Sequence, residues 1–144
     1  MTAFELAHRF VGEVKELSGS DEHPFVQWCH MLCGLGSNQP DETPWCSSFV
    51  NAIAWQLRLP RSKSAAARSW MAIGETVSGI NVASVGYDVV VLKRGTNPMQ
   101  GHVGFYAGAA GAHVSILGGN QGNTVSVAHF PLADLVGIRR LQSA

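Results

Sequence analysis

The chain has 144 residues, the size of one compact domain, so we expect residues 1–144 to form a single domain. Hydrophobic residues make up 46 % and charged residues 14 % of the sequence, a balance that favours a globular protein over a disordered one. Ten Lys and Arg balance ten Asp and Glu, so no net positive charge attracts the protein to nucleic acid or anionic lipid. Three cysteines are too few for a disulfide scaffold and leave at least one thiol unpaired.

The first half of the chain has the hydrophobic spacing of helices. Helices are predicted over 2–17, 24–33, 43–57 and 64–73. Thr2 and Glu5 form a capping box at the start of the first helix. In the third, Thr43 is the expected cap and Pro44 the first helical residue. This assignment puts Cys46 in the first turn of a helix.

The second half of the chain changes to short β-branched and aromatic runs separated by glycines. Strands are predicted over 89–92, 102–106, 113–117 and 124–127, with a closing strand at 135–141. Helices followed by antiparallel strands predict an α+β domain, with N-terminal helices packed on a C-terminal antiparallel β-sheet.

Cys46 is the first candidate for chemistry. The first turn of a helix has unpaired N–H groups and a partial positive charge, which favour a thiolate over a thiol. The structural alternative is a small buried hydrophobic residue, which is what most free cysteines are. A catalytic thiol also requires a base.

His102 is the candidate base, because Gly101 and Gly104 flank it and leave room for another group to approach. If 102–107 and 113–120 form a hairpin, Asn120 shares a face with His102 and its amide can fix the imidazole tautomer. A plain turn around Asn120 is the alternative. Other candidates for this third role are Asp41, Glu42 and Gln121.

A metal site was weighed for Cys29, His30 and Cys33, which lie within about one helical turn. Structural zinc sites use four ligands, typically in two close pairs, and the sequence has no second pair. No Gly-rich loop has the strand and helix context that phosphate binding requires. We therefore expect no metal and no cofactor.

Four segments, at 41–51, 67–70, 101–106 and 117–121, resemble the CHAP family (cysteine, histidine-dependent amidohydrolases/peptidases) and the related NlpC-type peptidases. The resemblance runs from about residue 40 to residue 140 and implies a papain-like fold. It implies Cys46 as nucleophile, His102 as base and Asn120 as third residue. Many CHAP enzymes have a glutamate near the position of Gly118 in this chain.

The implied function is peptidoglycan hydrolysis by an amidase or endopeptidase, through a cysteine thioester, as in a phage or prophage endolysin. The alternatives are a secreted antibacterial toxin with the same chemistry, a transamidase, or a non-catalytic wall-binding module. Trp45, Trp70 and Tyr106 are candidates for the walls of the substrate cleft, with a place in the core as the alternative.

The N-terminal ten residues carry Glu5 where a signal peptide has a basic region, and no long apolar run follows. We expect a monomer that is made in the cytoplasm without a signal peptide and does not insert into membranes. It would then act in the periplasm or cell wall after release by a holin or a secretion machine.

Overall fold

The computed structural model describes residues 1–14, 23–34 and 44–142. Its helices are α1 (Ala3–His8), α2 (Pro24–Leu32) and α3 (Cys46–Gln56), with 3-10 turns η1 (Ala67–Ala72), η2 (Ile80–Val82) and η3 (Leu132–Asp134). Its strands are β1 (Glu75–Val77), β2 (Asp88–Lys93), β3 (Gly101–Ala110), β4 (His113–Gly118), β5 (Ser126–Pro131) and β6 (Leu135–Arg140). None of the helices in the described parts combines the length and apolar character needed to cross a membrane.

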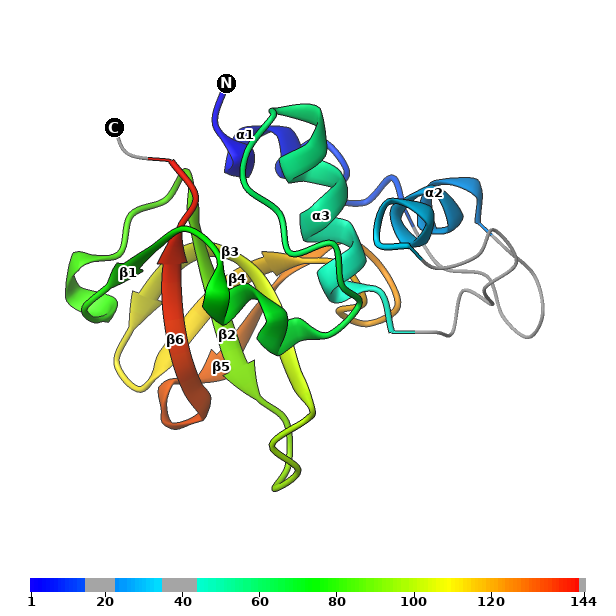
Figure 1. The fold of residues 1–144 in the computed structure, drawn as a ribbon. Helices are drawn as coiled ribbons and strands as arrows, with labels where there is room; N and C mark the ends of the chain where they lie inside the picture. Colours follow the sequence, from blue (N-terminus) through cyan, green and yellow to red (C-terminus); the bar gives the residue numbers. More distant parts are fainter. Residues whose placement is uncertain (15–22, 35–43, 143–144) are drawn as a thin grey trace.

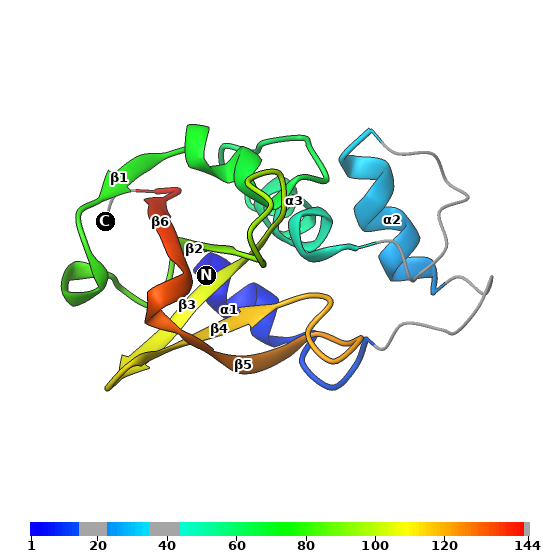
Figure 2. The same cartoon turned by 90° about the horizontal axis from the view of Figure 1, so that it is seen from below.

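In the described residues the strands form one antiparallel sheet in the order β1-β6-β2-β3-β4-β5. Helix α3 lies between the sheet and α2, and α1 lies beside α3 near the chain termini (Figures 1 and 2). The predicted α+β fold, with N-terminal helices packed on a C-terminal antiparallel sheet, is confirmed.

The interior of strand β2, residues 89–92, is apolar because both faces of the sheet are covered there. Val89 and Val91 belong to the core beneath the helices, whereas Val90 and Leu92 belong to a second core on the other face. All four are at most 1 % exposed. A strand buried on both faces has a continuous apolar run in place of an alternating one.

The first helix is shorter than predicted. Its capping box is confirmed: the Thr2 N–H donates to Glu5 Oε2 at 2.8 Å, and the Glu5 N–H donates to Thr2 Oγ1 at 3.1 Å. The helix nevertheless ends at His8, not at residue 17. Gly12 has a φ of 79°, and the N–H of Val125 donates to the carbonyl of Val14. Beyond α1 the chain continues in turns, and a backbone hydrogen bond ties the buried Val14 to Val125.

The third helix begins later than predicted, at Cys46, with Trp45 as the N-cap residue and no side-chain cap. Pro44 therefore precedes the helix, and Thr43 lies outside the described residues. The predicted 64–73 helix is the shorter 3-10 turn η1, β5 begins two residues after the predicted 124, and β1 was not predicted.

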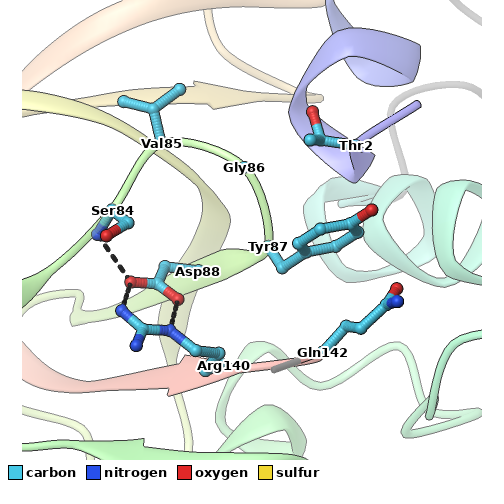
Figure 3. A pocket seen from close by; sticks show the side chains of 8 residues that line it. All are labelled: Thr2, Ser84, Val85, Gly86, Tyr87, Asp88, Arg140 and Gln142. Carbon is cyan, nitrogen blue, oxygen red and sulfur yellow. Dashed lines mark hydrogen bonds and ion pairs between the residues drawn. The ribbon is translucent and has the colours of Figure 1, made fainter. Parts of the chain in front are cut away.

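The start of β2 is held by a buried ion pair next to the two ends of the described chain (Figure 3). Asp88, 1 % exposed, accepts two hydrogen bonds from the Arg140 guanidinium at 2.7 and 2.8 Å. Its Oδ2 also accepts from the Ser84 N–H at 2.7 Å. Nearby, the N–H of Phe4 in α1 donates to the carbonyl of Gly86. The polar groups at this end of β2 are therefore paired with one another.

Candidate active site

Cys46 is the first residue of α3, and the close packing of α3 on the end of β4 sets its position. Trp45 is fully buried and meets Phe49 edge to face, with ring centroids 6.5 Å apart. A Cβ on Gly119 would lie 2.6 Å from the Trp45 indole and 2.9 Å from Phe49 Cβ. Only glycine permits this approach, so the Gly-Gly pair after β4 brings the sheet up to the nucleophile candidate.

Burial decides the protonation state of Cys46, which is only 4 % exposed. Loss of hydration raises the pKa of the thiol above its ordinary value. Hydrogen bonding from the N–H of Val103, the positive charge of Arg94 and the N–H groups of Ser47 and Cys46 lower this pKa without reversing the shift. The N–H groups at the helix start lower the pKa of the thiol as expected, but desolvation outweighs them in this resting structure.

His102, near the start of β3, is held by the side chain of Gln121. Its Nε2 lies 2.8 Å from Gln121 Oε1. The Gln121 amide nitrogen donates to the carbonyls of Ile116 at 3.0 Å and Ser126 at 2.7 Å, which leaves its oxygen to face the imidazole. An oxygen acceptor requires Nε2 of a neutral ring to carry the proton. Nδ1, which is buried and has no hydrogen-bond partner among the described residues, is then the basic nitrogen.

Asn120, the predicted partner of His102, does not hold this place. The register of the β3–β4 hairpin, if extended, would set Asn120 opposite His102, but β4 ends at Gly118 and Asn120 has a left-handed φ of 59°. The chain turns there and brings Gln121 back to the imidazole. A Cβ on Gly118 would lie 2.8 Å from Gln121 Oε1, so the absence of a side chain at 118 leaves the space that the Gln121 amide occupies.

His102 is buried, and loss of hydration lowers the pKa of its imidazole. The hydrogen bond with Gln121 raises this pKa and the charge of Arg94 lowers it, with a net shift downward. The Phe130 ring lies against the imidazole at a centroid distance of 5.1 Å. The ring is therefore neutral near pH 7, as a general base must be.

Cys46 and His102 are connected through the backbone of β3. The thiol interacts with the N–H of Val103, the residue that follows His102. No hydrogen bond between the thiol and the imidazole is present among the contacts of the described residues. Both side chains border hollows, and Arg94 borders both hollows.

The hollow beside Cys46 has a volume of about 230 Å³ and is lined by Pro44, Cys46, Ala65, Ala66, Ala67, Arg94, Met99, Gln100 and Gly101. The hollow beside His102 has a volume of about 480 Å³ and is lined by Arg94, His102, Asn120, Gln121, Gly122, Ser126, Ala128 and Phe130. Substrate groups can thus reach the surroundings of both reactive side chains.

The aromatic residues expected to wall the cleft belong to the core. Trp45 and Trp70 are fully buried, Tyr106 is 8 % exposed, and none of them lines either hollow. The Trp70 indole N–H donates to Ser47 Oγ at 2.9 Å, and Ser47 Oγ donates to the carbonyl of Ser64 at 2.6 Å. Trp70 therefore supports the residue after Cys46. The two tryptophans lie in the core because burial of a large apolar indole is favourable.

The remaining cysteines are structural. Cys29 and Cys33 are free and buried, and burial raises the pKa of both thiols. Within residues 1–14, 23–34 and 44–142, no three His, Cys, Asp or Glu side chains are grouped in a way that could hold a metal ion. Asp41 and Glu42, weighed for the third role, lie outside the described residues.

No protein-family model matches the chain, and no curated protein matches its sequence. Among solved structures, the fold is similar to that of NlpC1 from Trichomonas vaginalis, with 16 % sequence identity and a TM-score of 0.42. The similarity covers 90 % of this chain and 48 % of the other, so this chain spans about half the length of the structure that it matches.

Proposed function

We propose that the protein is a cysteine amidohydrolase or peptidase that cleaves an amide bond of bacterial peptidoglycan. Cys46 is the nucleophile, His102 the base and Gln121 the residue that orients the base. The observation that carries the proposal is the fixed imidazole: Gln121 Oε1 accepts a hydrogen bond from the Nε2–H of His102, which leaves Nδ1 as a basic nitrogen one residue from the N–H that contacts the Cys46 thiol. This is the division of roles in a Cys-His-amide triad.

In the proposed reaction, the Cys46 proton passes to His102 Nδ1 as the sulfur attacks the amide carbonyl carbon. The thiol turns toward Nδ1 for this step, since hydrogen bonds of this kind often form only with substrate bound. The C–N bond then breaks, and Nδ1 returns the proton to the departing amine. A water next gives a proton to Nδ1 and attacks the thioester, which releases the acid and restores the thiol.

The start of α3 supplies donors for the oxyanion of this reaction. Trp45 has no side-chain acceptor and does not cap the helix, so the N–H groups of Cys46 and Ser47 are not occupied by a cap. Oriented backbone donors of this kind stabilise the developing negative charge of a tetrahedral intermediate. A capped helix start, as predicted with Thr43, would have used part of this capacity.

The choice of peptidoglycan rests on the sequence. Segments around Cys46, His102 and Gln121 resemble CHAP and NlpC-type enzymes in their order along the chain. Release during phage or prophage lysis, as an endolysin, is the biological setting that we propose.

The experiment is digestion of purified sacculi, with the new termini identified by mass spectrometry. We expect new amino termini from the wild type. In Cys46→Ala and His102→Ala the rate of digestion should fall by about 1000-fold or more. Cys33→Ala is the matched control, because it removes a buried thiol outside both hollows and should retain activity.

Normal activity in Cys46→Ala would show that the nucleophile is wrong. Binding of the wild type to sacculi without any new termini would favour the wall-binding module.

A further inference from the structure

Arg94 directly follows β2 and borders both hollows of the proposed active site. Within residues 1–14, 23–34 and 44–142, its guanidinium makes no hydrogen bond or ion pair. Its charge acts on both Cys46 and His102. Its five N–H donors are therefore available to a ligand in either hollow.

Three other arginines of the chain donate hydrogen bonds to groups of the fold. Arg140 binds Asp88, Arg139 donates to the carbonyls of Ile73 and Gly74, and Arg68 donates to the carbonyl of Gln100. Arg94 differs from these because it borders a hollow on each side and has no partner among the described residues.

Among the described residues that line the two hollows, Arg94 is the only one with a full charge. In the part of the chain that the structure describes, no acidic residue lines either hollow. A guanidinium presents a planar fork that matches a carboxylate with two parallel hydrogen bonds. An anionic group is therefore the complementary chemistry for a substrate that extends from Cys46 towards His102.

We propose that Arg94 binds a free carboxylate on the substrate residue adjoining the scissile amide, so that the enzyme selects anionic peptides. This inference rests on the proposed function, because the scissile amide is the one that Cys46 attacks. Arg94 is a specificity-determining residue, and the substrate class is a peptide with a carboxylate close to the cleaved bond.

The test uses two synthetic peptides with the same scissile amide, one with the adjoining carboxylate free and the other with it amidated. For the wild type, kcat/KM should be about 10- to 100-fold higher for the acid, mainly through KM, as expected for a charge-assisted pair. In Arg94→Gln this ratio should fall to about 3-fold or less, and Arg94→Lys should keep part of it.

The ratio of acid to amide within each variant is the decisive quantity. Loss of Arg94 also removes a charge that lowers the pKa of both Cys46 and His102, and this effect cancels in the ratio. Lys93→Gln is the matched control, since it removes the same charge from the neighbouring exposed position, which lines neither hollow. It should keep the wild-type ratio.

Binding of both peptides to Cys46→Ala, measured by calorimetry, makes the test independent of turnover. If Cys46→Ala binds the acid more tightly than the amide, and Cys46→Ala/Arg94→Gln does not, the inference is supported. This holds even if the wild type hydrolyses neither peptide, because the absence of hydrolysis would count against the proposed function alone. Equal hydrolysis of both peptides by the wild type would overturn the inference and leave the function standing. Equal binding of the two peptides, or binding of neither, would also overturn it.

Discussion

The two ends of strand β2 handle charge in opposite ways. At the first residue, the buried Asp88 carboxylate accepts from the Arg140 guanidinium and from the Ser84 N–H, so its acceptors are paired (Figure 3). Just beyond the last residue, Arg94 has no partner among the described residues, and neither has Nδ1 of the neighbouring His102. Both ends have a hollow at the surface, of about 270 Å³ at the Asp88 end.

The paired end of β2 contributes to the stability of the fold, whereas the unpaired end offers groups for binding and catalysis. Buried polar groups in proteins are almost always paired, so the unpaired Nδ1 of His102 calls for an explanation, whereas Arg94 is exposed and open to solvent. The pairing around Asp88 holds β2, β6 and the preceding loop together. The unpaired groups at the other end contribute no such contact, and their availability is what binding and proton transfer require. Substitutions at the two ends should therefore affect different measurements.

The largest expected effect comes from breaking the paired end. Asp88→Asn should lower the free energy of unfolding by about 2 to 3 kcal/mol, within the range for hydrogen bonds to a charged group, because the charge that it leaves unpaired is on the partly exposed Arg140. Below its unfolding temperature the variant should hydrolyse peptidoglycan like the wild type. Urea denaturation and sacculus digestion measure the two quantities.

Arg94→Gln is the matched change at the unpaired end and should alter the free energy of unfolding by less than about 0.5 kcal/mol. If Asp88→Asn were as stable as the wild type, the ion pair would not be what holds this end of β2.

The next largest effect concerns the residue that orients the base. Gln121→Ala should lower kcat about 10- to 100-fold with little change in KM, because the amide orients His102 and does not contact substrate. Asn120→Ala is the control and should stay within about 3-fold of the wild type in kcat, the scatter expected for a residue outside the catalytic group.

Gln121→Glu tests the contact with His102 through the pH profile of activity, which would not change if Gln121 had a purely structural role. A carboxylate beside the imidazole raises the pKa of His102, so the acidic limb of the pH profile should move to higher pH. A larger loss in Asn120→Ala than in Gln121→Ala would return the third role to Asn120.

The smallest expected effect is in pH dependence. Burial lowers the pKa of His102 from its ordinary value of 6.5, so the acidic limb of kcat/KM should lie below pH 6.5. The free energy of unfolding should also fall at acid pH, because His102 binds a proton more readily in the unfolded chain than in the folded one. The stabilising contribution of the neutral imidazole is therefore complete above pH 6.5 and declines as the pH falls below it. Denaturation at several pH values compares the wild type with His102→Gln, in which this contribution is absent.

An acidic limb above pH 6.5 would contradict a buried neutral imidazole.

Much of the fold could be predicted from local sequence patterns. The apolar run at 89–92 and the segments at 102–106 and 113–117 lie in observed strands, and the segment at 135–141 exceeds β6 by one residue, because periodicity and glycine-rich turns are local signals. The error in α1 arose because apolar residues at helical spacing can also be buried by packing in turns against a distant part of the chain. Val14 is buried in this way beside Val125.

Local sequence patterns were sufficient for the order of helices and strands, for Cys46 in a helical first turn and for His102 at the start of a strand, since each depends on neighbours along the chain. The contact of Gln121 with the imidazole depends instead on the folded chain, on where β4 ends and on the left-handed turn at Asn120. The same holds for the raised pKa of the Cys46 thiol and for the place of Trp45 and Trp70 in the core. These properties follow from burial, which is set by residues distant in sequence.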